Sequence, residues 1–236
     1  MKRTLVLFDI DGTLLLSAGA GRRAIHAALA QGGVNLAPAT GIRFDGKTDP
    51  QIVMELLAAA GEPPPYDPQR VAALLEQYVS HLERDLKTHG HQARLMPGIP
   101  ALLDALESDA GVLLGLLTGN VQHGATLKLR AAGLNPGRFV VGAFGSDHER
   151  RGELPKVAAA RAEPHFGRVP TGAEVVIIGD TPADVHCAAS IGARTIAVAT
   201  GGYGVAELAA AGADRVYADF SDLRPALEGI LFSSSS

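Results

Sequence analysis

Five short apolar runs, each followed by a polar loop, constrain the fold of this chain more than any other feature of its sequence. They are rich in Val, Ile and Leu and lie at residues 5–8, 112–117, 139–141, 175–178 and 195–198. Continuous apolar runs of this length are typical of strands buried on both faces, and helical spacing between them is typical of crossover connections. The sequence therefore predicts an α/β fold with a doubly wound, Rossmann-like parallel sheet.

The alternation of strands and helices is interrupted after residues 14–16. The following stretch of about eighty residues shows apolar side chains at helical spacing and no convincing buried strand. The glycine-rich segment at 17–21 and the Pro97-Gly98 pair mark its ends. We therefore expect a core domain formed by residues 1–16 and 93–232, an inserted α-helical cap domain formed by residues 17–92, and a disordered tail at residues 233–236.

Charge and cysteine content exclude several classes of protein. The chain has 21 basic and 25 acidic side chains, a net charge of −4, which provides no basic surface for nucleic acid. The longest uncharged stretch is too polar for a membrane-spanning helix, and early acidic residues argue against a secretion signal. Cys187 is the only cysteine, so an internal disulfide is impossible. We expect a cytoplasmic monomer or homodimer that binds neither nucleic acid nor membranes.

Polar residues follow the apolar runs where the strands should end. Asp9 and Asp11 close the first run and would point to the same side of an extended chain. The second run ends in Thr118-Gly119-Asn120, and Asp180 and Asp184 follow the fourth. The carboxyl ends of parallel strands share one edge of the sheet, where ligands bind. Carboxylates gathered there require a cation, and an all-oxygen set favours Mg2+.

Four segments, in chain order, resemble the signature motifs of the haloacid dehalogenase-like (HAD) hydrolase superfamily. They are DIDGT, LLTGN, the lysine of ELPK, and IGDTPAD. The helical insertion directly after the first motif is similar to that of the subgroup containing phosphoglycolate phosphatase and beta-phosphoglucomutase. The resemblance therefore implies a HAD-type core with a helical cap and a Mg2+-dependent activity on a small phosphorylated metabolite.

The resemblance also implies a role for each motif residue. Asp9 would be the nucleophile and Asp11 the general acid and base. A carboxylate that attacks phosphorus forms an aspartyl-phosphate, and a second carboxyl group can protonate the leaving oxygen and then deprotonate water. The groups implied to bind the phosphoryl group are Thr118, Gly119, Asn120 and Lys156, and those implied to hold Mg2+ are Asp9, Asp11, Asp180 and Asp184. The charged stretch at residues 147–151 is interpreted as a solvated loop before Lys156.

The segment at residues 44–50 resembles the specificity loop of the subgroup. Lys47 and Thr48 are its candidates for contact with the leaving group, and the alternative is a solvated lysine beside an Asp49 helix cap. These residues would determine which alcohol is released.

The expected function is a Mg2+-dependent phosphatase that hydrolyses a small phosphomonoester, of the phosphoglycolate or sugar-phosphate type, through an aspartyl-phosphate on Asp9. The alternatives within the family are a phosphomutase of the beta-phosphoglucomutase type and a phosphonate hydrolase that would use Lys47 for a Schiff base. From other classes, a phospho-receiver domain and a nicotinamide-dependent dehydrogenase remain. The dehydrogenase rests on the G-x-G-x-x-A pattern of residues 19–24, for which a hinge into the cap is the favoured interpretation.

Overall fold

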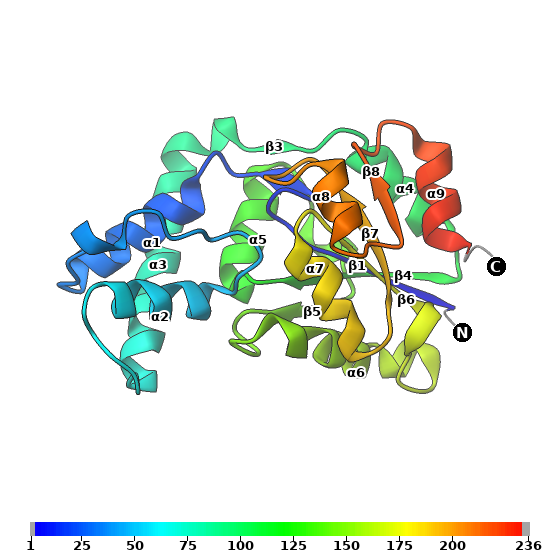
Figure 1. Ribbon diagram of the computed structural model, residues 1–236. Helices are drawn as coiled ribbons and strands as arrows, with labels where there is room; N and C mark the ends of the chain where they lie inside the picture. Colours follow the sequence, from blue (N-terminus) through cyan, green and yellow to red (C-terminus); the bar gives the residue numbers. More distant parts are fainter. Residues whose placement is uncertain (1–2, 233–236) are drawn as a thin grey trace.

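A six-stranded parallel sheet forms the centre of the structure (Figure 1). The computed structural model describes residues 3–232 and orders the strands β5-β4-β1-β6-β7-β8. Every neighbouring pair in this sheet is parallel. The strands are β1 (Thr4–Phe8), β4 (Val112–Thr118), β5 (Val141–Phe144), β6 (Val175–Gly179), β7 (Arg194–Val198) and β8 (Arg215–Tyr217). The predicted doubly wound α/β fold is therefore confirmed.

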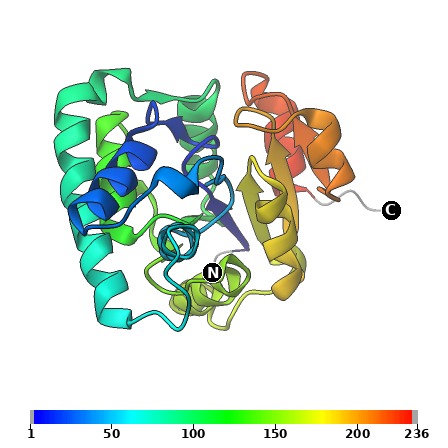
Figure 2. The same cartoon turned by 60° about the vertical axis from the view of Figure 1, so that its left-hand side comes forward.

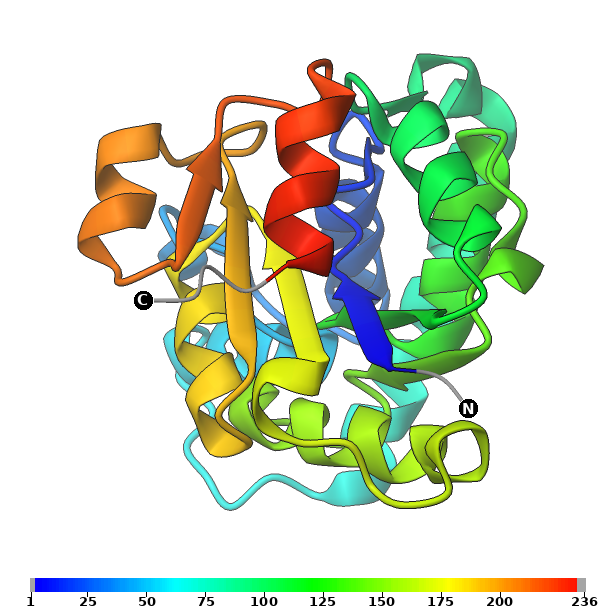
Figure 3. The same ribbon diagram turned by 90° about the vertical axis from the view of Figure 1, so that its right-hand side faces the viewer.

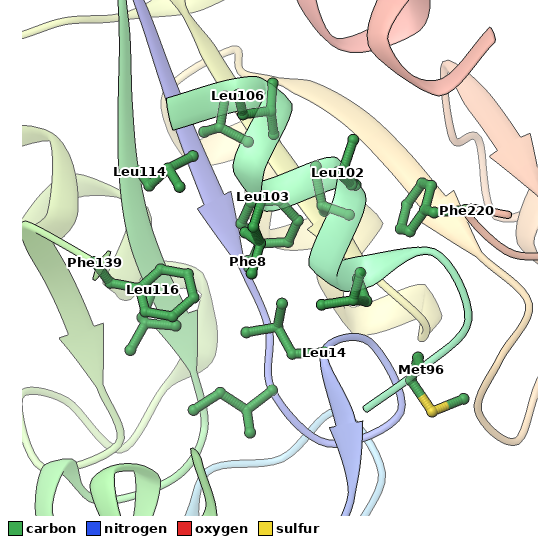
Figure 4. Packing of buried hydrophobic residues seen from close by; sticks show 14 of the residues in the cluster. Phe8, Leu14, Met96, Leu102, Leu103, Leu106, Leu114, Leu116, Phe139 and Phe220 are labelled. Carbon is green, nitrogen blue, oxygen red and sulfur yellow. The ribbon is translucent and has the colours of Figure 1, made fainter. Parts of the chain in front are cut away.

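Helices cover both faces of the sheet because its strands are apolar on both sides. Val6 and Phe8 face a cluster with α4 and α9, whereas Leu5 and Leu7 face a cluster with α6 and α7. Figure 3 shows α4 and α9 in front of the sheet, and Figure 4 shows Leu103 of α4 packed close to Phe8. The core helices are α4 (Ile99–Ser108), α5 (Gln122–Ala131), α6 (Leu154–Phe166), α7 (Pro182–Cys187), α8 (Val205–Ala210) and α9 (Leu223–Leu231).

Three helices between β2 (Leu15–Leu16) and β3 (Arg94–Leu95) lie together beside one end of the sheet (Figures 1 and 2). We call them the helical insertion; they are α1 (Ala20–Gln31), α2 (Asp49–Ala59) and α3 (Pro68–His89). They share a buried cluster that includes Ile25, Leu56 and Tyr78, and α3 also packs against α5. The insertion thus has its own apolar core. None of the helices in residues 3–232 is both long and apolar enough to cross a membrane.

The structure differs from the predicted elements at short strands. Strands β2 (Leu15–Leu16) and β3 (Arg94–Leu95) pair antiparallel where the chain leaves and re-enters the core, and neither they nor β8 were predicted. Strands of two or three residues are too short to show a periodicity. The run at 139–141 enters the sheet only at Val141, because a 3-10 turn over Pro136–Arg138 precedes it. The predicted tail at 233–236 lies outside the described residues.

Gly98 offers a test of how the start of α4 is fixed against the loop between β8 and α9. It precedes α4 with φ of 80°, and a Cβ atom there would lie 1.9 Å from the carbonyl oxygen of Phe220. Gly133 has a similar φ of 78° but no atom within 4 Å of such a Cβ atom. We expect Gly133→Ala to cost about 1 kcal/mol, from backbone strain alone, and Gly98→Ala to cost at least about twice that. Urea unfolding measures both, and equal losses would contradict the packing argument.

Candidate active site

A cavity of about 310 Å³ opens at the carboxyl edge of the sheet, beside β1, β4 and β6. Its walls come from the loops that follow these strands and from the helical insertion. The predicted site residues that line it are Asp9, Asp11, Lys47, Thr118, Gly119, Asn120 and Asp180. A larger groove of about 1150 Å³ lies between α3 and the loop at 145–149, and none of these seven residues lines it. The sheet order therefore brings the residues after three neighbouring strands into one cavity.

Three buried carboxylates form the most acidic part of the site. Asp9, Asp180 and Asp184 are 7%, 3% and 2% exposed, and one oxygen of each lies within 4.8 Å of the others. Burial raises the pKa of Asp9 to about 6. Burial and the neighbouring charges of Asp184 and Asp9 raise the pKa of Asp180 well above its usual value. An all-oxygen cluster with this electrostatic cost is suited to a hard divalent cation.

Neighbouring hydroxyl groups hold two of these carboxylates in place. Thr13 Oγ1 donates to Asp180 Oδ1 at 3.0 Å. Thr181 donates to Asp184 Oδ2 from its backbone nitrogen at 3.0 Å and from Oγ1 at 2.7 Å. Thr181 is also the N-cap of α7, so the start of this helix fixes Asp184 in orientation.

Arg151 is the buried cation beside the first aspartate. Its Nη2 lies 3.2 Å from Asp9 Oδ1 and also hydrogen-bonds to Asp184 Oδ1. The side chain is 7% exposed, and its Nε has no hydrogen-bond partner among the described atoms. Charge-assisted hydrogen bonds of this kind are stronger than neutral ones. The stretch interpreted as a solvated loop therefore supplies a buried site residue.

Lys156 does not line the cavity. Its Nζ is 2.9 Å from Glu153 Oε2, and its side chain is 54% exposed. The helix α6 begins at Leu154 and packs Leu154 and Ala158 inward, which leaves position 156 on the solvent side. The structure therefore replaces Lys156 with Arg151 as the basic residue next to Asp9.

A second buried cation, Lys128, holds Asp11. Lys128 Nζ donates to Asp11 Oδ2 and to Asn120 Oδ1, both at 2.6 Å, and is 4% exposed. Asn120 Nδ2 donates to Asp11 Oδ2 and to Thr118 Oγ1, both at 2.8 Å. Burial opposes ionisation of Asp11, yet the charge of Lys128 lowers its pKa overall. Lys128 was missed because it lies on α5, eight residues after Asn120, where the direction of a side chain depends on where the helix begins.

The segment at 44–50 anchors the insertion as well as facing the cavity. Thr48 is fully buried, donates from Oγ1 to the carbonyl of Glu149 at 2.6 Å, and caps α2 by accepting from the Gln51 nitrogen. Its hydroxyl is therefore used within the protein, and Thr48 does not line the cavity. Lys47 does line it, with its ammonium group hydrogen-bonded to Glu55. The structure thus places Thr48 in contacts within the protein and not against the cavity.

The glycine pattern at residues 19–24 lacks the context of a dinucleotide site. It opens α1, which follows the two-residue strand β2 of a separate antiparallel pair, and no strand of the main sheet leads into it. The dinucleotide fingerprint requires a parallel strand directly before the helix. The dehydrogenase interpretation is therefore wrong.

The fold and site together define an α/β enzyme whose active site is built from carboxylates and buried basic side chains. The chain belongs to the haloacid dehalogenase-like hydrolase family, whose sequence model matches residues 6–189. The predicted family is thus confirmed.

Known proteins of this family resemble the chain over most of its length. Phosphoglycolate phosphatase of Cereibacter sphaeroides is 32% identical over 203 residues, covering 84% of this chain and 85% of its own. The enzyme of the same name from Rhodospirillum rubrum is 31% identical over 92% of this chain and 88% of its own. A hydrolase from Pseudomonas syringae has a similar structure, with a TM-score of 0.71 and 26% identity over 96% and 98% of the chains. This chain is therefore a phosphatase of the family.

Solved structures with lower identity share the fold. CbbY from Rhodobacter sphaeroides, solved in complex with phosphate, gives a TM-score of 0.70 at 21% identity over 94% of this chain and 96% of its own. It supports the α/β core with a helical insertion as a common architecture.

The site can be tested directly, because Arg151 lies next to Asp9 where Lys156 was expected. Arg151→Ala should lower kcat by about 10²- to 10³-fold, the usual effect of removing one preorganised donor at a reacting group. Lys156→Ala removes a solvated ion pair and should leave kcat within about twofold of the wild type. Steady-state hydrolysis of 4-nitrophenyl phosphate measures both variants. The reverse pattern would restore Lys156 to the site.

Proposed function

We propose that this phosphatase hydrolyses a small phosphomonoester through a covalent aspartyl-phosphate on Asp9, with phosphoglycolate as the first candidate substrate. The observation that carries the proposal is the position of Asp9, whose carboxylate contacts Arg151 and also belongs to the buried acidic cluster. The phosphoglycolate phosphatases that resemble the chain support the choice of substrate.

The chemistry divides between the two aspartates of the first motif. Asp9 attacks phosphorus, so that a bond from its carboxylate oxygen to phosphorus forms while the bond to the leaving oxygen breaks. In the substrate complex Asp11 must be protonated, so that it gives its proton to the leaving oxygen and becomes the carboxylate that Lys128 stabilises. Water then attacks phosphorus, the bond from Asp9 to phosphorus breaks, and Asp11 takes up the proton of that water. Lys128 and Asn120 fix the Asp11 carboxylate for both transfers. Hydrolysis thereby becomes two steps that use one base.

The phosphoryl oxygens would be bound by groups whose hydrogen-bond donors are not all used within the protein. Thr118 Oγ1 accepts from Asn120, and its own proton has no acceptor among the described residues. Arg151 Nε is likewise buried without a partner in the described part of the chain. A phosphoryl group carries its negative charge on its peripheral oxygens, where such donors stabilise it during transfer. We assign both groups to phosphoryl binding.

The acidic cluster fits a divalent cation, and we propose that Asp9, Asp180 and Asp184, with the carbonyl of Asp11, hold Mg2+. All the donors are oxygen atoms, and burial raises the pKa of both Asp9 and Asp180, so the charges of these two groups lack full compensation within the protein. When bound, Mg2+ neutralises phosphoryl charge and keeps Asp9 ionised.

Two alternatives within the family differ in what this site must provide. A phosphonate hydrolase needs a lysine whose amine is free to form a Schiff base, whereas the Lys47 side chain is paired with Glu55. A phosphomutase would use the same attack by Asp9, and it is distinguished by transfer of the phosphoryl group to a sugar instead of water. We propose hydrolysis as the reaction. We also propose that residues 17–92 form a cap domain and that the active protein is a cytoplasmic monomer or homodimer.

The nucleophile is tested by Asp9→Asn, which is nearly isosteric but cannot attack phosphorus. We expect turnover of phosphoglycolate with Mg2+ to fall by at least about 10³-fold, while the unfolding temperature changes little. A panel of phosphoglycolate, sugar phosphates and nucleotides, assayed with the wild type, identifies the substrate. More than a few per cent of residual activity in Asp9→Asn would contradict the covalent mechanism.

The metal site is tested by stability as a function of pH. Because the folded-state pKa of Asp9 is about 6, above its ordinary value of 3.8, the metal-free protein should lose stability as pH rises from about 4 through 6. Mg2+ should therefore raise the unfolding temperature strongly at pH 7.5 and weakly at pH 5, where protons compete with it. In Asp180→Ala the shift at pH 7.5 should be much smaller. An undiminished shift in that variant would place the cation elsewhere.

A further inference from the structure

One basic side chain at the cavity differs from the others in having no acidic partner. Three of the four basic residues that line the cavity are paired with carboxylates of the protein, and only Arg22 has no such pairing among residues 3–232. The three pairs are Lys47 with Glu55, Lys128 with Asp11, and Arg151 with Asp9 and Asp184. The charge of Arg22 therefore remains available for a ligand.

Arg22 is held in position by contacts that leave this charge uncompensated. It lies in the first turn of α1, where its Nη1 donates to the carbonyl of Ile42 at 3.2 Å. Its guanidinium carbon lies 3.9 Å from the centroid of the Phe44 ring, which itself packs edge-on against His26. A ring face and a carbonyl attract a guanidinium group but do not neutralise it. Several of its N–H groups have no acceptor in the described part of the chain.

The place of Arg22 assigns it to the leaving group of the substrate. The proposed phosphoryl-binding groups, Thr118 and Arg151, belong to the core, whereas Arg22 belongs to the helical insertion. The alcohol part of a bound ester, which points away from Asp9, is the part left for the insertion to contact. Guanidinium groups bind carboxylates and phosphates through paired hydrogen bonds. A cavity of about 310 Å³ suits a small ester.

We propose that Arg22 determines specificity by binding a second anionic group, a carboxylate or a phosphate, on the leaving alcohol. This inference rests on the proposed phosphatase function and adds a residue outside the segment at 44–50. Lys47 is the weaker candidate because a substrate anion would have to compete with Glu55, which also accepts from Gln51 Nε2. The substrate class is therefore a phosphomonoester with a negative charge at its other end.

The experiment compares two substrates of nearly equal size in the full-length protein with Mg2+. Phosphoglycolate has a terminal carboxylate, and 2-hydroxyethyl phosphate has an uncharged hydroxyl group in its place. For Arg22→Ala we expect kcat/KM to fall about 10- to 100-fold with phosphoglycolate, mainly through KM, and to stay within about twofold with 2-hydroxyethyl phosphate. Arg22→Lys, which keeps the charge but not the planar fork, should recover part of the loss.

The matched control is Arg84→Ala. Arg84 is also an exposed arginine of the insertion; it contacts the Ser80 carbonyl and His81 and lies outside the cavity. We expect no change with either substrate. Fructose 1,6-bisphosphate, assayed in the same variants, shows which anion Arg22 binds. If kcat/KM falls only with fructose 1,6-bisphosphate, the bound group is a phosphate. If it falls only with phosphoglycolate, the bound group is a carboxylate.

Three outcomes would overturn parts of the inference separately. Equal losses in Arg22→Ala with charged and uncharged substrates, or no loss with any, would show that Arg22 does not bind the leaving group. A wild-type preference for 2-hydroxyethyl phosphate would refute the anionic substrate class while leaving the phosphatase function intact. If the wild type hydrolysed none of the three esters, both the proposed function and the inference would be overturned. Thermal unfolding of each variant checks that the losses are not caused by unfolding.

Discussion

Charge compensation at the carboxyl edge of the sheet is the constraint on which the rest of the site depends. Three buried carboxylates and one half-buried carboxylate meet two buried cations there, which leaves a formal charge of −2; the groups are Asp9, Asp180, Asp184 and Asp11, with Arg151 and Lys128. Like charges at this spacing would destabilise the fold unless the remainder were neutralised. A divalent cation would supply the opposite charge, so the residues to which we assign the chemistry also form a cluster that could hold a metal ion.

The helical insertion is joined to this edge through the backbone as much as through side chains. The Asp49 nitrogen donates to the Gly119 carbonyl at 2.7 Å, and the Val121 nitrogen donates to Asp49 Oδ2 at 2.8 Å. A Cβ atom on Gly119 would lie 2.0 Å from the Lys47 carbonyl oxygen, so only glycine permits this approach. Residues that were expected to bind phosphate or substrate therefore also lie where the insertion contacts the core.

The sequence was sufficient for five of the six strands of the sheet and for the acids, and insufficient for β8 and for the cations. Long buried runs reveal strands, and a side chain directly after a parallel strand must lie at the ligand-binding edge, which located Asp9 and Asp180. Arg151 and Lys128 lie on a turn and a helix, where the direction of a side chain depends on where the element begins and what packs against it. Lys156 shows the same limit. It belongs to a motif that was recognised, yet the basic residue next to Asp9 is Arg151, five positions earlier.

The two buried cations are different residues because they have different tasks. Arg151 contacts both Asp9 and Asp184 with Nη2 alone, and its guanidinium group still has Nε, which has no partner among the described residues, for a further acceptor. Lys128 meets one carboxylate and one amide oxygen at 2.6 Å each, which suits a compact ammonium group. Exchange of the two residue types would leave the formal charge unchanged. It would nevertheless remove the additional Nε donor beside Asp9 and place a larger side chain beside Asp11, so geometry as well as charge distinguishes the two positions.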